Sequence, residues 1–212
     1  MACSSSSHIV SKTQDFTSSG TFVVPDNIFS LHVRAWGAGG AGGDQNPNTE
    51  LGAGGGSGAY VEGDVSVQPG ESVDVTVGSG GQPVSGASGL DGGTTQVQTM
   101  DSLLTATGGS GGNINGNGGT GGTASGGDVN LIGQNGGNAL DQDAGMGGSA
   151  PLGGAGGFPS TSIVPTVPGG AGAGGVFGDV VVGGQAGANG LVILQWSDIV
   201  VVQSHVWHDY CC

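Results

Sequence analysis

The residues best suited to chemistry lie at the C-terminal end of the chain. Residues 205–212 contain imidazole and thiol groups, which are ligand types that zinc prefers: His205, His208, Cys211 and Cys212. In an extended strand, His205 and His208 would point to opposite faces, and the spacing matches no common zinc ribbon or finger. These residues are therefore weak metal candidates. We assign no metal to the protein and expect the segment to serve packing or assembly.

Two glycine motifs are similar to those of cofactor-binding and nucleophilic sites. Residues 37–42 fit G-x-G-x-x-G after a predicted strand, and residues 108–112 fit G-x-S-x-G around Ser110. A dinucleotide site needs a helix after the glycines, whereas residues 43–47 read Gly-Asp-Gln-Asn-Pro. A nucleophile elbow needs a strand-to-helix turn and an activating histidine, and the sequence indicates neither. Because 51 glycines produce such matches by chance, we expect no cofactor and no enzymatic activity.

The remaining candidates are acidic and thiol side chains. Asp141 and Asp143 could ligate calcium, but the EF-hand and Gly-Gly-X-Gly-X-Asp spacings are missing, so we expect a solvated loop. Cys3 lies far in sequence from Cys211 and Cys212. A bridge from Cys3 to the tail in oxidising surroundings and three reduced thiols in a cytoplasm both remain open. Mass spectrometry under non-reducing conditions distinguishes the two.

Composition and charge exclude several classes of protein. Of 212 residues, 35% are hydrophobic and only 8% charged, whereas disordered chains are usually highly charged. The acidic residues outnumber Lys12 and Arg34 and give a net charge of −14, which repels nucleic acid and anionic membranes. The opening residues lack a signal peptide, and no apolar run is long enough to span a membrane. We expect a protein made in a host cytoplasm, with no membrane insertion and no nucleic-acid partner.

The elements that would position these residues are β-strands. Apolar residues alternate along 31–35, 73–77 and 192–196, which is the period of a half-buried strand. No glycine-free segment of a dozen residues shows helical spacing. We therefore predict an all-β fold built as an antiparallel β-sandwich.

Glycine tracts alternate with these strands along most of the chain. The main tracts are residues 37–43, 52–58, 108–112, 116–127, 145–157 and 169–175. Their drifting spacing excludes collagen, and a flexible linker would be one or two tracts rather than many. Extended glycine chains adopt the polyproline II helix, whose outward N–H and C=O groups can bond to neighbouring chains. We therefore predict a bundle of polyglycine II helices inserted in the sandwich.

The segments between the glycines resemble a known family. Residues 20–25 read Gly-Thr-Phe-Val-Val-Pro, residues 31–40 read Leu-His-Val-Arg-Ala-Trp-Gly-Ala-Gly-Gly, and residues 190–196 read Gly-Leu-Val-Ile-Leu-Gln-Trp. Intervening segments keep the expected order: 54–60, 69–71, 75–81 and 104–109. Over about residues 16–196 the chain resembles the glycine-rich domain at the ends of bacteriophage tail fibres. Its layout is also similar to the glycine-rich ectodomain of some receptor tyrosine kinases.

This resemblance implies both a fold and a function. The fold is a jelly-roll or tumour-necrosis-factor-like sandwich carrying a polyglycine II bundle. We expect an N-terminal arm at 1–15, the glycine-rich domain at 16–196 and a C-terminal strand or assembly tail at 197–212. The function is host attachment, by a structural protein of the virion surface that acts as a phage fibre or receptor-binding subunit. Because no long shaft precedes the domain, a capsid decoration protein or a self-assembling filament subunit is the alternative.

Residues beyond the closing strand are candidates for assembly. Four of them form a run of high β-propensity: Ile199, Val200, Val201 and Val202. The run is either an edge strand offered to another subunit or an extra strand of the same sandwich, and both interpretations remain open. Trp207 and Cys3 complete the assembly candidates. The partners we expect are further copies of the chain, trimers being common among such fibres, other virion proteins and a host cell-surface receptor.

Overall fold

A computed structural model describes residues 4–44, 51–140, 143–159, 164–172, 174 and 183–204. Within these residues the regular elements are β-strands, and the described part of the chain contains no helix. The strands are β1 (Ser4–Phe16), β2 (Gly20–Val23), β3 (Ser30–Trp36), β4 (Tyr60–Ser66), β5 (Ser72–Thr76), β6 (Thr95–Gln98), β7 (Leu103–Ala106), β8 (Ala124–Ser125), β9 (Val129–Leu131) and β10 (Leu191–Ser204). The predicted all-β class is confirmed.

The strands form two five-stranded antiparallel sheets. The first has the order β1-β10-β3-β4-β9 and the second the order β2-β5-β6-β7-β8. Burial alternates along β3, where Leu31, Val33 and Ala35 are buried, because successive side chains of a strand point to opposite faces. The apolar residues of both sheets join in one core: Phe22, Leu31, Val33, Val61, Val73, Val97, Leu104, Val192 and Leu194. This arrangement agrees with the predicted antiparallel β-sandwich.

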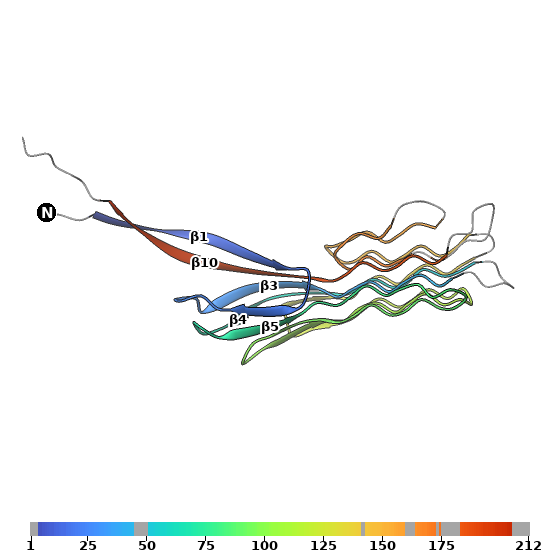
Figure 1. The fold of residues 1–212 in the computed structure, drawn as a ribbon, viewed down its shortest axis with the longest axis horizontal. Helices are drawn as coiled ribbons and strands as arrows, with labels where there is room; N and C mark the ends of the chain where they lie inside the picture. The colour runs from blue at the N-terminus through green and yellow to red at the C-terminus, as the bar shows by residue number, and fades with distance from the viewer. Residues whose placement is uncertain are drawn as a thin grey trace, which may run out of the picture.

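Strands β1 and β10 extend beyond the sandwich as a ribbon. β10 pairs with β3 only from Leu191 to Gln195, whereas its pairing with β1 continues from Val192 opposite Phe16 to Ser204 opposite Ser4. Figure 1 shows the two strands projecting together from one end of the sandwich. Residues 4–15 of the expected N-terminal arm thus belong to β1, and β10 runs unbroken across the boundary expected at residue 197.

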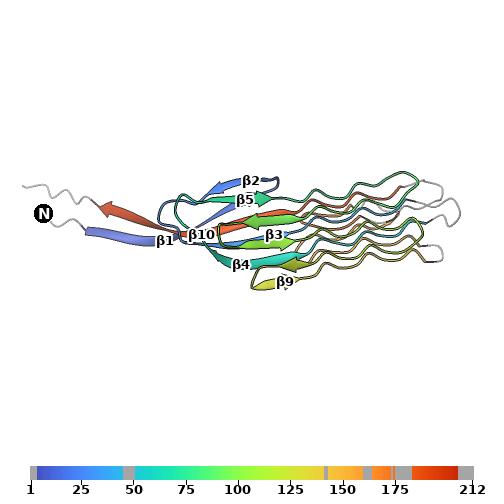
Figure 2. The ribbon, with the colours of Figure 1, turned by 90° about the horizontal axis from the view of Figure 1, so that it is seen from below.

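Glycine segments leave the other end of the sandwich. Residues 37–44 continue β3 outward and residues 51–59 return to β4, and residues 77–94 and 107–123 make the same excursion between β5 and β6 and between β7 and β8. The described parts of residues 132–190 run between β9 and β10 in the same region. Figures 1 and 2 show these segments side by side, extending away from the β1–β10 ribbon.

The junction between sandwich and glycine segments is marked by a buried aromatic pair. Trp36 ends β3 and Tyr60 begins β4, and their ring centroids are 4.7 Å apart. The indole Nε1 of Trp36 donates to the backbone oxygen of Pro151 at 2.9 Å. Both rings are buried in a small cluster with Ala150 of the glycine region, separate from the core between the sheets, and Leu191 and Ile193 of β10 pack against it.

Candidate functional site

Backbone hydrogen bonds of residues 37–44 change partner with a period of three residues. The N–H groups of residues 37, 40 and 43 donate to the carbonyls of Ala59, Gly56 and Ala53. The N–H groups of residues 38, 41 and 44 donate instead to Gly93, Leu90 and Ala87, and those of 39 and 42 to Ala188 and Gln185. Each step of three along the central segment is matched by a step of three in its neighbour. Adjacent segments therefore share one repeat.

Residues 51–59 repeat this arrangement one layer away. The N–H groups of residues 53, 56 and 59 donate to the carbonyls of Asn113, Ser110 and Thr107. Those of residues 54 and 57 donate to the carbonyls of Gly137 and Gln134. Those of residues 55 and 58 donate to the carbonyls of Gly172 and Gly169. The carbonyls of the same segment accept from still other segments, which include the N–H groups of Gly119, Gly122, Gly145 and Gly148. Every N–H group from residue 53 to residue 59 thus donates to a neighbouring segment.

Close approach explains why most of these residues are glycine. Every residue of 37–44 and of 51–59 is buried. A Cβ added at Gly58 would overlap the carbonyl oxygen of Gly37, and one at Gly39 would overlap that of Gly170. Because the neighbouring element is backbone rather than a movable side chain, no rotamer change relieves the overlap.

Side-chain oxygens take the place of missing neighbours at the bundle surface. The side-chain oxygens of Asn135 and Asn138 accept from the N–H groups of Gly121 and Gly118 at 2.9 and 2.8 Å. Asn189 and Asp91 do the same for Gly80 and Gly111, both at 2.8 Å. Within the described part of the chain these N–H groups have no backbone acceptor, and an Asn or Asp side chain supplies one.

The glycine motifs singled out in the sequence lie inside this bundle. The N–H groups of residues 37–42 already bond to neighbouring segments, so they are not available to a phosphate. Ser110 Oγ lies 2.9 Å from Thr120 Oγ1, across two adjacent segments. Asp143 exchanges backbone hydrogen bonds with Leu140, and Asp141 lies outside the described residues.

The structure places the assembly candidates Ile199, Val200, Val201 and Val202 within β10. Their backbone pairs with Ile9, His8, Ser7 and Ser6 of β1. The side chains of Ile9 and Ile199, which lie opposite each other, are 73% and 67% exposed. Lys12 Nζ donates to Asp198 Oδ2 at 2.6 Å across the same ribbon. Outside the described residues lie Cys3, Trp207 and the weak metal candidates His205, His208, Cys211 and Cys212.

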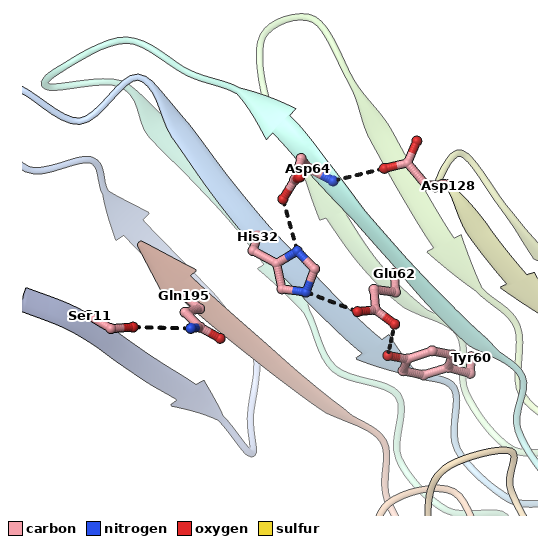
Figure 3. A network of polar contacts seen from close by, with 7 residues as sticks. All are labelled: Ser11, His32, Tyr60, Glu62, Asp64, Asp128 and Gln195. Atoms are coloured by element: carbon pink, nitrogen blue, oxygen red, sulfur yellow. Dashed lines mark hydrogen bonds and ion pairs between the residues drawn. The ribbon is translucent and has the colours of Figure 1, made fainter. Parts of the chain in front are cut away.

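A polar network that the sequence analysis missed lies on the outer face of β3 and β4. His32 Nδ1 is 2.8 Å from Asp64 Oδ1, and its Nε2 is 3.0 Å from Glu62 Oε1 (Figure 3). Tyr60 Oη donates to Glu62 Oε2 at 2.6 Å, and Asp128 Oδ2 accepts from the N–H of Asp64. Both ring nitrogens of His32 can donate to carboxylates only in the imidazolium form.

Burial and hydrogen bonding shift two pKa values in this network in opposite directions. Burial, followed by the hydrogen bond to Glu62, raises the pKa of Tyr60 far above its ordinary value of 10.0. The bond that Tyr60 donates, assisted by His32, lowers the pKa of Glu62 below its ordinary value of 4.5. Among the described residues, no three or more His, Cys, Asp or Glu side chains are arranged to hold a metal ion. The network links side chains of β3 and β4 across the strand pair.

Pairing between β3 and β4 creates this network. His32 lies opposite Asp64, and the neighbouring pair places Arg34 opposite Glu62. The alternation along 31–35 predicts that His32 and Arg34 face outward, which is the only signal available in the sequence. The sequence of β3 alone does not predict which residue of β4 lies opposite His32 or Arg34.

The fold and its polar contacts can be compared with known protein families. The described residues contain no helix long and apolar enough to cross a membrane. A search of curated protein sequences finds no significant match. A family model described as a glycine-rich domain matches residues 16–197, which include β2 to β9, the part of β10 that pairs with β3, and the glycine segments. The chain therefore belongs to the glycine-rich domain family.

Proposed function

We propose that this protein is a non-enzymatic structural subunit of a virion surface that attaches the particle to its host. In this proposal the glycine bundle is a rigid spacer, and the turns at its free end contact a receptor on the host cell. Its other partners would be virion proteins at the ribbon end. The resemblance to the glycine-rich domains of phage tail fibres motivates the choice of a virion.

The observation that carries the proposal is that the two ends of the molecule differ in structure. The β1–β10 ribbon lies at one end, and the turns that join glycine segments lie at the other (Figures 1 and 2). Two of these turns are closed by hydrogen bonds, from the N–H of Ala87 to Val84 and from that of Gly116 to Asn113. A subunit held by one end and exposed at the other suits attachment, because turns on a rigid scaffold tolerate sequence variation.

We also propose that the glycine segments are polyglycine II helices. The supporting observation is the three-residue period of hydrogen-bond partners in residues 37–44 and 51–59, which equals the repeat of the polyproline II helix. Ordering the backbone costs about 1–2 kcal/mol per residue, so a glycine helix without internal hydrogen bonds needs many neighbours. The finer relationship of the sandwich to jelly-roll or tumour-necrosis-factor-like folds belongs to the same proposal.

Cell binding of turn variants tests the attachment function. Ser85 lies exposed in the turn closed by Ala87, whereas Met100, 73% exposed, lies in the turn between β6 and β7 at the other end of the sandwich. We expect fluorescently labelled chain to bind host cells, Ser85→Arg to weaken the binding and Met100→Arg to leave it unchanged. Equal loss in both variants, or binding that no turn variant alters, would contradict attachment through the free end.

The open ribbon favours the alternative, a capsid decoration or filament subunit. Such a protein would need the ribbon to bind its neighbours and would not need the free end to bind cells. Immunogold labelling of particles from the producing cells separates the two functions. Label on particles together with cell binding supports attachment, label on particles without any cell binding supports decoration, and label on filaments alone supports a filament subunit.

A further inference from the structure

The β1–β10 ribbon has two open hydrogen-bonding edges. Beyond Gln195, the side of β10 that faced β3 has no strand beside it in the described part of the chain. Among the strands that the structure describes, β1 is the last of its sheet, and its outer side is paired with none of them. The two open edges lie on opposite sides of one ribbon, and residues 4–12 of β1 match residues 196–204 of β10 pair by pair.

A ribbon of two strands is a marginal structure in water. Isolated hairpins gain little stability, because neither face buries apolar surface against another layer. Here Ile9 and Ile199 lie opposite each other on one face and remain 73% and 67% exposed. A long strand pair with open edges and exposed isoleucines is the kind of surface that recruits further strands.

Charge makes the ribbon the best place for identical chains to meet. The whole chain carries a net charge of −14, so two copies repel each other over most of their surfaces. Residues 4–12 and 196–204 contain one cation and one anion, Lys12 and Asp198, and no other Lys, Arg, Asp or Glu. Their charges sum to +1 − 1 = 0, and the two side chains already form an ion pair at 2.6 Å.

We propose that copies of this chain assemble through the ribbon, with the outer edge of β1 in one copy pairing with the open edge of β10 in the next. Such an interface joins two different edges, so it closes into a ring when the rotation between copies permits. All neighbours in the ring are antiparallel, and closure leaves no open edge. The ring contains three or more copies, because two ribbons would give a four-stranded barrel with no room for interior side chains.

A groove lies beside the sandwich, where the open edge of β10 begins, and supplies space for the incoming strand. It encloses about 620 Å³ and lies where β10 separates from β3, lined by residues that include Asn27, Phe29, Trp196 and Ser197. Trp196 Nε1 is buried and has no hydrogen-bond acceptor among the described residues. A β1 strand of the next copy, running toward the sandwich beside β10, would end over this groove.

Disulfide formation between two single-cysteine chains tests the pairing. One chain carries Ile9→Cys, the other carries Ile199→Cys, and both have serine in place of Cys3, Cys211 and Cys212. After co-expression and oxidation, we expect a disulfide that joins the two kinds of chain. Either chain expressed alone should stay uncrosslinked, since neighbouring β1 strands would lie about 10 Å apart with a β10 strand between them, too far for a disulfide. Ser85→Cys, in an exposed turn of the bundle, serves as the control cysteine.

A disulfide that forms as readily in one variant alone would mean that like edges pair, and it would overturn the proposal. Mass measured by light scattering gives an independent readout. We expect wild-type chain at three or more times 20.1 kDa, Ile9→Lys as a monomer, and Ile132→Lys, equally exposed at 73% but on the glycine segments, unchanged. A monomeric or dimeric wild type, or an Ile9→Lys variant of undiminished mass, would also overturn it. The inference does not depend on the attachment function, because the readouts involve no host cell.

Discussion

Gly58 illustrates the constraint on single residues in the bundle. An added Cβ would overlap the backbone of Gly37, and backbone in a bonded segment cannot move aside. We expect Gly58→Ala to lower the free energy of unfolding by about 3 kcal/mol, the upper range for overpacking a filled core. Denaturation in urea measures the change.

Gly183 provides the matched control for Gly58→Ala. Among the described residues, a Cβ at Gly183 would meet only the Asp44 side chain, at 3.4 Å, which is ordinary contact. Gly183→Ala should change stability by no more than about 0.5 kcal/mol. If both variants were equally stable, the close packing of segments 51–59 and 37–44 would not hold.

Tyr60 and Glu62 form the residue pair whose titration is most altered by the fold. The hydrogen bond from Tyr60 lowers the pKa of Glu62, so the ionised carboxylate stabilises the fold above pH 4.5. This contribution is lost as the pH falls through the folded pKa. Tyr60→Phe removes the donor and keeps the ring against Trp36, so we expect the pKa of Glu62 to rise toward 4.5 and the acid loss of stability to shrink. Carbon NMR of the Glu62 carboxyl measures the pKa, and an unchanged value would exclude Tyr60 as the cause.

At the level of elements, the two central glycine segments are more buried than the turns of the bundle. Residues 37–44 and 51–59 are buried and bonded to several neighbouring segments, whereas the turn 113–116 is half-buried to exposed. We expect amide hydrogens of the central segments to exchange only through global unfolding, and those of the turn to exchange through local opening. Hydrogen exchange followed by mass spectrometry measures the exchange rates of both regions. Equally fast exchange in the central segments would mean that the bundle is loose, and it would contradict a rigid spacer.

In this chain, sequence patterns predict which segments form strands better than they predict which segments lie side by side. Alternation along 31–35 and 192–196 predicts strands correctly, because one face of each is buried. The strand β1 has no such alternation, since its side chains at residues 8–15 are mostly exposed, and its first residues are four serines. Glycine tracts are visible in the sequence, but residue 37 bonds to Ala59, residue 38 to Gly93 and residue 39 to Ala188. No local rule predicts these distant partners, because glycine has no side chain to specify them.

At the level of the whole molecule, sandwich and bundle share their central elements. β3 continues directly into residues 37–44, and residues 51–59 continue directly into β4. The buried pair Trp36 and Tyr60 lies at the junction and belongs to both parts. Loss of order in the bundle would therefore remove the ends of β3 and β4 from their packing. The two parts should behave as one cooperative unit rather than as two domains.

A paired test of cooperativity follows from this continuity. Leu194→Ala removes a fully buried side chain in the sandwich, with an expected cost of about 2–5 kcal/mol, and Gly58→Ala strains the bundle. Each variant should shift a single transition, seen at the same midpoint by Trp fluorescence and by exchange of amides in residues 51–59, because neither part retains its core without the other. Val164→Ala, at a side chain 62% exposed, is the control and should leave the midpoint unchanged. If Gly58→Ala produced a second transition that left the Trp36 signal native, bundle and sandwich would be independent units. The glycine segments would then fold on a preformed sandwich rather than together with it.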